Sequence, residues 1–167
     1  TGAQGWRTGY VVPVMSGTLN GAVTVDGVSV ALDGGTAYHD HNWGFWEGVS
    51  WQWGQVQQQE LSVLYGRVFP PADAADRDRL PGFIGILGPD GPLGYATDVR
   101  IRETNGADGR PRQISVEGFA ANFNVKMTIA VQSAILTKAG ASGRLSSGLD
   151  FLQIDRKSTR LNSSHRT

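Results

Sequence analysis

The stretch TAYHDHNWGFWEG, residues 36–48, concentrates side chains that can do chemistry. It holds two histidines, two carboxylates, an asparagine, a tyrosine and two tryptophans. These residue types support metal binding by histidine and carboxylate, or proton transfer by a carboxyl group beside aromatic rings. They also fit a purely structural role, in which polar side chains bond to the backbone where strands turn and tryptophans fill the core.

A metal site would use the two histidines of this stretch. His39 and His41 are two residues apart, so they share a face if the segment is a strand. Together with Glu47 they come close to the first metal-binding motif of cupins. Cupins take a further histidine from a later strand, and the third histidine here, His165, lies in a tail that we exclude below. The metal site is therefore an alternative to proton transfer.

Proton transfer would centre on Asp40. In an extended segment Asp40 points away from both histidines and shares its face with Tyr38 and Asn42. A carboxyl group among aromatic rings is poorly solvated, which favours its protonated form, and a protonated aspartic acid can donate a proton. This arrangement suits protonation of an electron-rich alkene, because tryptophan faces stabilise a developing cation. The nearby tryptophans are Trp43, Trp46, Trp51 and Trp53.

The segments around this stretch have the period of β-strands. "GAVTVDGVSVAL" predicts a hairpin around a type I′ turn at Asp26-Gly27, and Pro13 predicts an edge strand or a bulge. Trp51 and Trp53 alternate on one strand face, which is typical of a core or of the pocket of a barrel. We interpret residues 70–81 as a long hairpin connection, and "VKMTIAVQSAIL" as a strand that could pass for a helix. About eight to ten short strands predict an all-β barrel or sandwich.

Composition limits the classes of function. The 167 residues are 40% hydrophobic and 18% charged, which predicts a globular domain with a core. The absence of cysteine excludes disulfides and thiolate metal sites, and no apolar run is long enough to span a membrane. The chain opens on Thr1 rather than Met, so we expect a missing N-terminus and predict no localisation.

The end of the chain has a different character. Residues 155–165, DRKSTRLNSSH, resemble the in-frame translation of a common sequencing adapter. We therefore interpret residues 1–154 as the domain and residues 155–167 as a non-native tail. Without the tail the 15 basic residues lose four and the 15 acidic residues lose one, so the domain is near −3. It has no basic stripe that would predict nucleic-acid binding.

The motif YHDHNWG, followed by WQWG and the LSVLYGR strand, resembles the carotenoid 1,2-hydratase family. This family is also called hydroxyneurosporene synthase or AttH-like, and tocopherol cyclase-like proteins are related to it. The resemblance extends from about Val11 to Ile154. It implies two consecutive lipocalin-like (calycin-type) antiparallel β-barrels, of which this chain would hold the end of the first and most of the second.

The resemblance also implies an activity, namely hydration or cyclisation of a lipophilic, isoprenoid-like alkene by acid catalysis without a metal or organic cofactor. Asp40 matches the proton donor, and His39 and His41 would orient it or position water. Such a substrate would require transient membrane contact without stable insertion. One alternative is a non-catalytic lipocalin-like binding module for a hydrophobic ligand, and a second is the cupin-like metal site. The expected substrate-binding residues are Tyr38, Asn42, Trp43, Trp51 and Trp53.

Overall fold

The computed structural model describes residues 7–45, 49–70, 82–138 and 150–165. The regular structure in these ranges is β-strand throughout, which confirms the predicted all-β class. Twelve strands are described, a few more than the periodicity predicted. They are β1 (Arg7–Leu19), β2 (Ala22–Val25), β3 (Val28–Ala31), β4 (Gly35–Phe45), β5 (Ser50–Gln58), β6 (Leu61–Phe69), β7 (Phe83–Gly88), β8 (Gly91–Ala96), β9 (Asp98–Asn105), β10 (Pro111–Ala120), β11 (Phe123–Lys138) and β12 (Asp150–His165).

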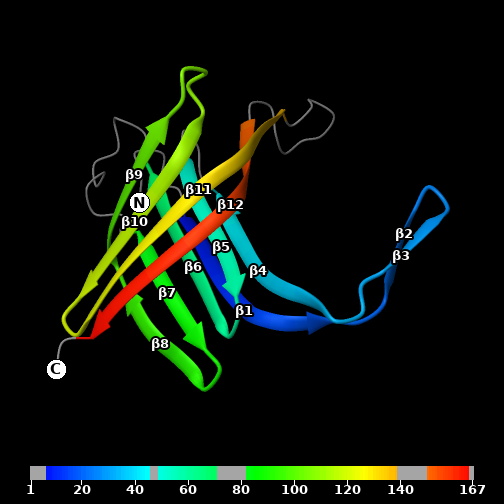
Figure 1. The fold of residues 1–167 in the computed structure, drawn as a ribbon, viewed down its shortest axis with the longest axis horizontal. Helices are drawn as coiled ribbons and strands as arrows, with labels where there is room; N and C mark the ends of the chain where they lie inside the picture. Colours follow the sequence, from blue (N-terminus) through cyan, green and yellow to red (C-terminus); the bar gives the residue numbers. More distant parts are fainter. Residues whose placement is uncertain (1–6, 46–48, 71–81, 139–149, 166–167) are drawn as a thin grey trace. The chain divides into compact units, whose positions relative to one another are not determined.

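The chain divides into two compact units, Thr1–Asp98 and Val99–Thr167. The first unit holds β1 to β8, and it contains the whole YHDHNWG motif (Figure 1). Its strands form the antiparallel sheet β5-β6-β7-β8, the two-stranded ribbon β1-β4 and the hairpin β2-β3. The second unit is the antiparallel sheet β12-β11-β10-β9.

Side chains of the β5-β8 sheet bind the β1-β4 ribbon in the first unit. Gln57 Nε2 donates to the carbonyl oxygens of Ala37, at 2.8 Å, and Met15, at 3.2 Å. Ser62 Oγ donates to the same Met15 carbonyl at 2.7 Å. Ser62 is buried, so its hydroxyl needs such a partner. These bonds hold the ribbon across one face of the sheet.

The two faces of the β5-β8 sheet differ because side chains alternate along each strand. One face carries buried apolar residues, among them Val63, Tyr65 and Ile84. The other face carries Trp53, Leu64 and Phe83, which the register places on the side of Ser62 and hence of the ribbon. The motif on β4 therefore meets the face that is richer in rings and glycines.

Glycines on this sheet lie opposite aromatic rings. Gly54 pairs with Tyr65 and Gly66 pairs with Phe83 in the register. A Cβ atom on Gly54 would lie 2.4 Å from Tyr65 Cε1, and one on Gly66 would lie 2.7 Å from Phe83 Cε1. Each ring therefore covers the backbone of its partner strand, an arrangement that a larger residue would prevent.

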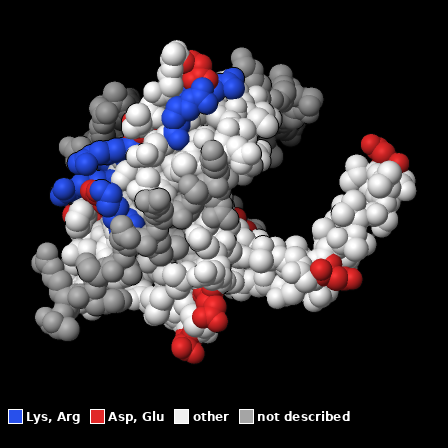
Figure 2. Space-filling view, in the orientation of Figure 1, with Lys and Arg blue, Asp and Glu red and all other residues white. Residues whose placement is uncertain are grey.

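The β2-β3 hairpin has the predicted turn. Asp26 and Gly27 have φ values of 50° and 80°, which a type I′ turn requires. The register pairs Val23 with Val30 and Val25 with Val28, so four exposed valines share one face. Figure 2 shows acidic side chains at both ends of the β2-β3 hairpin.

A bulge interrupts β1 at the predicted position. Val11 pairs with His41 and Val14 pairs with His39, so the register shifts by one residue across Val12 and Pro13. Proline lacks the N–H that a regular ladder would need, which favours a bulge here. The prediction for Pro13 is confirmed.

The second unit confirms that "VKMTIAVQSAIL" is a strand, within β11. Ile114, Val116, Val125 and Met127 alternate along β10 and β11 and are buried. β12 continues through His165 and pairs with β11, so the adapter-like residues lie in a strand. Strand pairing uses backbone groups that every sequence carries, so the pairing of β12 does not show whether these residues are native. The interpretation of residues 155–165 as adapter-derived therefore stays a prediction.

The four sheets that the described residues form are open, so closure into a lipocalin-like barrel stays a prediction. β6 and β7 are antiparallel neighbours, as a hairpin connection requires, and residues 71–81 of that connection lie outside the described ranges. Within those ranges no helix has the length and apolar character to cross a membrane.

The pairing of glycines with rings makes a prediction about stability. Gly54→Ala should lower the free energy of unfolding by about 1–3 kcal/mol, because Tyr65 is buried and has little room to move. Gly85→Ala is the matched control, since its Cβ would lie 3.5 Å from Tyr95 in ordinary contact. Urea unfolding of both variants measures the difference. Equal stabilities for the two variants would contradict the close approach at Gly54.

Candidate functional site

A hydrogen-bonded cluster joins β1, β4 and β5 around Asp40. Asp40 Oδ2 accepts hydrogen bonds from the Tyr10 hydroxyl at 2.9 Å and from the Tyr38 hydroxyl at 3.1 Å. The two hydroxyl oxygens are 2.7 Å apart, and Trp53 Nε1 donates to the Tyr10 oxygen at 2.8 Å. All four side chains come from the first unit, and we call them the Asp40 cluster.

The oxygens of the cluster form one more close contact than the tyrosine hydroxyls have protons to fill. Three oxygens make three mutual contacts, whereas the two tyrosine hydroxyls supply only two protons. With Asp40 ionised, two of the contacts hold a proton. With Asp40 protonated, all three contacts can hold one. The cluster can therefore gain or lose a proton on Asp40 with its heavy atoms in place, which is what a proton donor and acceptor requires.

The two tyrosines of the cluster are held in their neutral form. Burial raises the pKa of Tyr38, and its hydrogen bond with Tyr10 and the charge of Asp40 raise it further. Burial also raises the pKa of Tyr10, against the opposing effect of its bonds to Tyr38 and Trp53. Both phenols therefore stay hydrogen-bond donors at neutral pH and are weaker acids than ordinary tyrosine.

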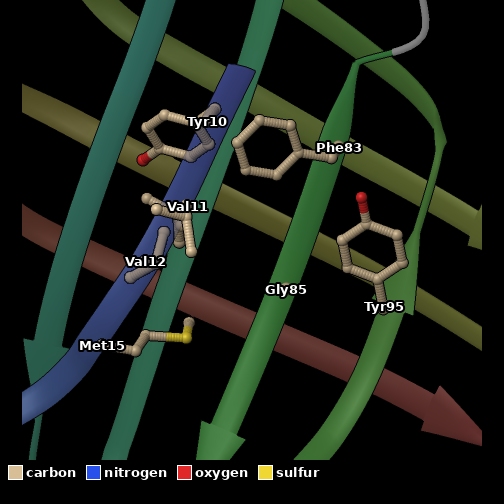
Figure 3. A pocket seen from close by; sticks show the side chains of 8 residues that line it. Tyr10, Val11, Val12, Met15, Phe83, Gly85 and Tyr95 are labelled. Carbon is tan, nitrogen blue, oxygen red and sulfur yellow. The ribbon is translucent and has the colours of Figure 1, made fainter. Parts of the chain in front are cut away.

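An apolar pocket adjoins the cluster. It has a volume of about 220 Å³ and lies between β1 and the β6-β7-β8 part of the sheet (Figure 3). Gly85 lines the pocket from β7, where it has no side chain to fill the space beside the Tyr95 ring (Figure 3). The pocket is lined mainly by Tyr10, Val12, Met15, Leu64, Phe83 and Tyr95.

Tyr10 belongs to both the cluster and the pocket. Its ring lies 5.8 Å from the Phe83 ring, centroid to centroid, and lines the pocket. Its hydroxyl lies on the side of the ring away from Phe83, as Figure 3 shows, and contacts Asp40. The apolar pocket and the carboxyl group are thus separated by one side chain.

The β1 bulge brings Tyr10 and Met15 to the same pocket. In a regular strand residues five apart point to opposite faces. The extra residue at Val12–Pro13 shifts the register, and both Tyr10 and Met15 line the pocket. The same register puts Tyr10 opposite Asn42, on the β4 face that carries Tyr38 and Asp40.

Three of the predicted site residues meet in the cluster. Asp40 and Tyr38 share a face of β4, as their spacing indicated, and their side chains are bonded. Trp53 joins them from β5, with its ring 5.4 Å from that of Tyr38. Trp53 is 41% exposed, so it is a rim residue rather than a core residue.

The other predicted residues lie elsewhere. His39, His41 and Trp43 alternate with Asp40 along β4 and lie on its opposite face, exposed. The Trp43 ring contacts the His41 ring at 5.7 Å and crosses Gly9 rather than reaching the cluster.

Asn42 and Trp51 lie near the ends of their strands. Asn42 Oδ1 accepts a bond from Thr8 Oγ1 at 3.2 Å, away from Asp40. Trp51 shares the face of Trp53 on β5 and pairs with Val68.

The cupin-like alternative needed a third ligand beside the histidines. His39 and His41 share an exposed face of β4, and Glu47 lies outside the described residues. In the part of the chain that the structure describes, no three histidine, aspartate or glutamate side chains come together as a metal site.

Tyr10 is the residue of the Asp40 cluster that the sequence motif did not reveal. It lies 28 residues before Tyr38, beyond the β2-β3 hairpin, and reaches Asp40 only through the β1-β4 pairing. The available signal was an aromatic residue three positions before Pro13. A bulge at the proline changes the direction of the side chains beside it, and so can bring such a residue to the site.

Comparisons with protein-family models, curated proteins and solved structures found no match to this chain. The resemblance in the YHDHNWG and WQWG motifs therefore stays a prediction.

The raised pKa values of Tyr10 and Tyr38 predict that the folding stability of the chain falls at alkaline pH. Their raised pKa values mean that the folded chain retains protons that the unfolded chain loses above the ordinary value of 10.0. This contribution to stability is complete below that pH and should fall as pH rises past it.

Tyrosinate absorbance in a pH titration measures the effect. The native chain should titrate partly above the urea-unfolded chain, and Tyr10→Phe and Tyr38→Phe should each remove part of the late absorbance. Superimposable native and unfolded titrations would contradict the burial of these phenols.

Proposed function

We propose that this chain carries out acid-catalysed hydration or cyclisation of a lipophilic, isoprenoid-like alkene, with Asp40 as the proton donor. The observation that carries the proposal is the double role of Tyr10, whose ring lines the apolar pocket and whose hydroxyl contacts Asp40. An acid beside a site for hydrocarbon is what protonation of an alkene requires.

The chemistry needs only groups of the chain and water. The π electrons of the alkene form a C–H bond with the Asp40 proton, which leaves a tertiary carbocation and the Asp40 carboxylate. Water then adds to the cation and returns a proton to Asp40, giving a tertiary alcohol. In a cyclisation a second double bond attacks the cation, and the ring product returns the proton.

The surroundings of Asp40 favour both products of the proton transfer, the carboxylate and the carbocation. The Tyr10 and Tyr38 hydroxyls donate to Asp40 Oδ2, so they stabilise the carboxylate that the proton transfer creates. The rings of Tyr38 and Trp53 lie 5.4 Å apart beside the carboxyl group and offer π faces to a cation. Neither phenol competes as the acid, because burial raises the pKa of both.

We also propose membership in the carotenoid 1,2-hydratase family and a lipocalin-like barrel in the complete protein. Support comes from the YHDHNWG and WQWG motifs and from the antiparallel sheet that has an apolar pocket on the face covered by β1. A lipophilic substrate would reach the site through transient membrane contact. The sequence lacks the basic stripe that would favour nucleic acid as a partner.

A non-catalytic binding module is the second candidate. The apolar lining of the pocket is sufficient to hold a hydrophobic ligand, and the bonds to Asp40 also fit a structural network that fixes β1 against β4. Such a carrier would bind the same ligands without needing a proton on Asp40.

Deuterium incorporation distinguishes the two candidates. Limonene is a suitable probe, because it is a small isoprenoid whose protonation gives a tertiary cation. The wild-type chain in heavy water should give deuterated α-terpineol or isomerised alkene. Asp40→Asn should lower this rate by at least about a hundredfold, as expected for loss of a general acid, and bind limonene nearly as before.

The control is Asp90→Asn, which removes a carboxylate from the exposed β7-β8 turn and should leave the rate unchanged. Equal rates for Asp40→Asn and wild type would refute the acid role. Limonene binding without any deuterium incorporation in the wild type would instead support the carrier.

A further inference from the structure

Gln55 has a buried hydrogen-bond donor that the fold does not use. Its side-chain Nε2 is shielded from solvent and, among the residues that the structure describes, has no hydrogen-bond partner. Native proteins pair nearly all such groups, because a buried unpaired N–H costs free energy. A buried donor that the fold leaves unpaired is available to a ligand.

The register places Gln55 next to the Asp40 cluster. It lies on β5 between Trp53 and Gln57, whose side chains point to the same face. Trp53 donates to the Tyr10 hydroxyl and Gln57 donates to the Ala37 carbonyl, so both neighbours reach the β1-β4 ribbon. Across the strand pair, Gln55 lies opposite Leu64, which lines the apolar pocket.

We propose that Gln55 Nε2 binds the oxygen that enters or leaves the reaction, as water or as the hydroxyl of a tertiary alcohol. The lining of the neighbouring pocket is mostly apolar, so a hydrocarbon ligand brings no acceptor for this N–H. Water and a tertiary alcohol each bring one. This inference rests on the proposed function and favours hydration over cyclisation, because an all-carbon cyclisation has no oxygen for Gln55 to bind.

The position of the donor fits capture of the cation by water. An N–H that binds one lone pair of a water oxygen leaves the other lone pair free to form the C–O bond. The resulting oxonium then gives a proton to the Asp40 carboxylate, which completes the addition of water to the alkene. Without the donor the same cation loses a proton from a neighbouring carbon and returns to an alkene.

Binding of a matched pair of probes tests Gln55 without turnover. α-Terpineol is the tertiary alcohol that water and limonene form, so the two ligands differ by one water. Gln55→Met, which keeps the length of the side chain but lacks the donor, should weaken α-terpineol binding about fivefold, as for one neutral hydrogen bond, and leave limonene binding unchanged. Gln58→Met, at an exposed position of the same strand, is the matched control and should change neither.

The stability of the ligand-free variant supplies a second measurement. Because Nε2 is unpaired, Gln55→Met should leave the urea midpoint unchanged or raise it. A lowered midpoint would mean that Gln55 has a structural role, which would overturn the proposal. Equal weakening of both ligands, or of neither, would also overturn it.

The products of limonene in heavy water separate this inference from the proposed function. Gln55→Met should shift the deuterated product from α-terpineol to terpinolene, since one hydrogen bond is worth about fivefold in the partition. An unchanged product ratio would overturn the role of Gln55 while leaving the acid role of Asp40 intact. No deuterium incorporation by the wild type would overturn the proposed function, and the binding measurement would still decide whether Gln55 recognises an oxygen atom.

Discussion

The hydrogen bonds that meet at the Tyr10 hydroxyl tie three strands of the first unit to one point. The oxygen receives the indole N–H of Trp53 from β5 and contacts Tyr38 and Asp40 on β4. These bonds require a neutral phenol, and burial keeps it neutral by raising the pKa of Tyr10. The same side chain forms part of the pocket wall and bonds to both the carboxyl group and the tryptophan. A single side chain therefore belongs both to the lining of the apolar pocket and to the hydrogen bonds around Asp40.

Much of this arrangement follows from local sequence. Period-two alternation predicted the strands, the Asp26-Gly27 turn predicted the hairpin, and Pro13 predicted the bulge. The spacing of Tyr38 and Asp40 predicted their shared face. Each of these features depends on neighbours within a few residues, where backbone sterics and side-chain direction are decisive.

The rest depends on pairing between distant strands. The contribution of Tyr10 requires the β1-β4 register, including a bulge whose size the sequence does not specify. Trp43 is an instructive opposite case, because the face of β4 on which it lies was readable from the sequence. It is three residues from Asp40, so a strand turns it to the face of the histidines, where it covers Gly9. Barrel closure involves the whole set of strands, and activity involves a ligand, so neither follows from local patterns.

Gly66 and Gly85 determine how easily the pocket can change by mutation. Both lie on the sheet face that carries Leu64 and Phe83, and Gly85 lines the cavity directly. A methyl group at Gly85 would meet only Tyr95, at ordinary contact distance, whereas one at Gly66 would displace the Phe83 ring. Single substitutions at these sites would therefore change the size or shape of the pocket without changing Asp40 itself. A lineage could change the molecule that fits this pocket through these two codons while keeping the carboxyl group of Asp40.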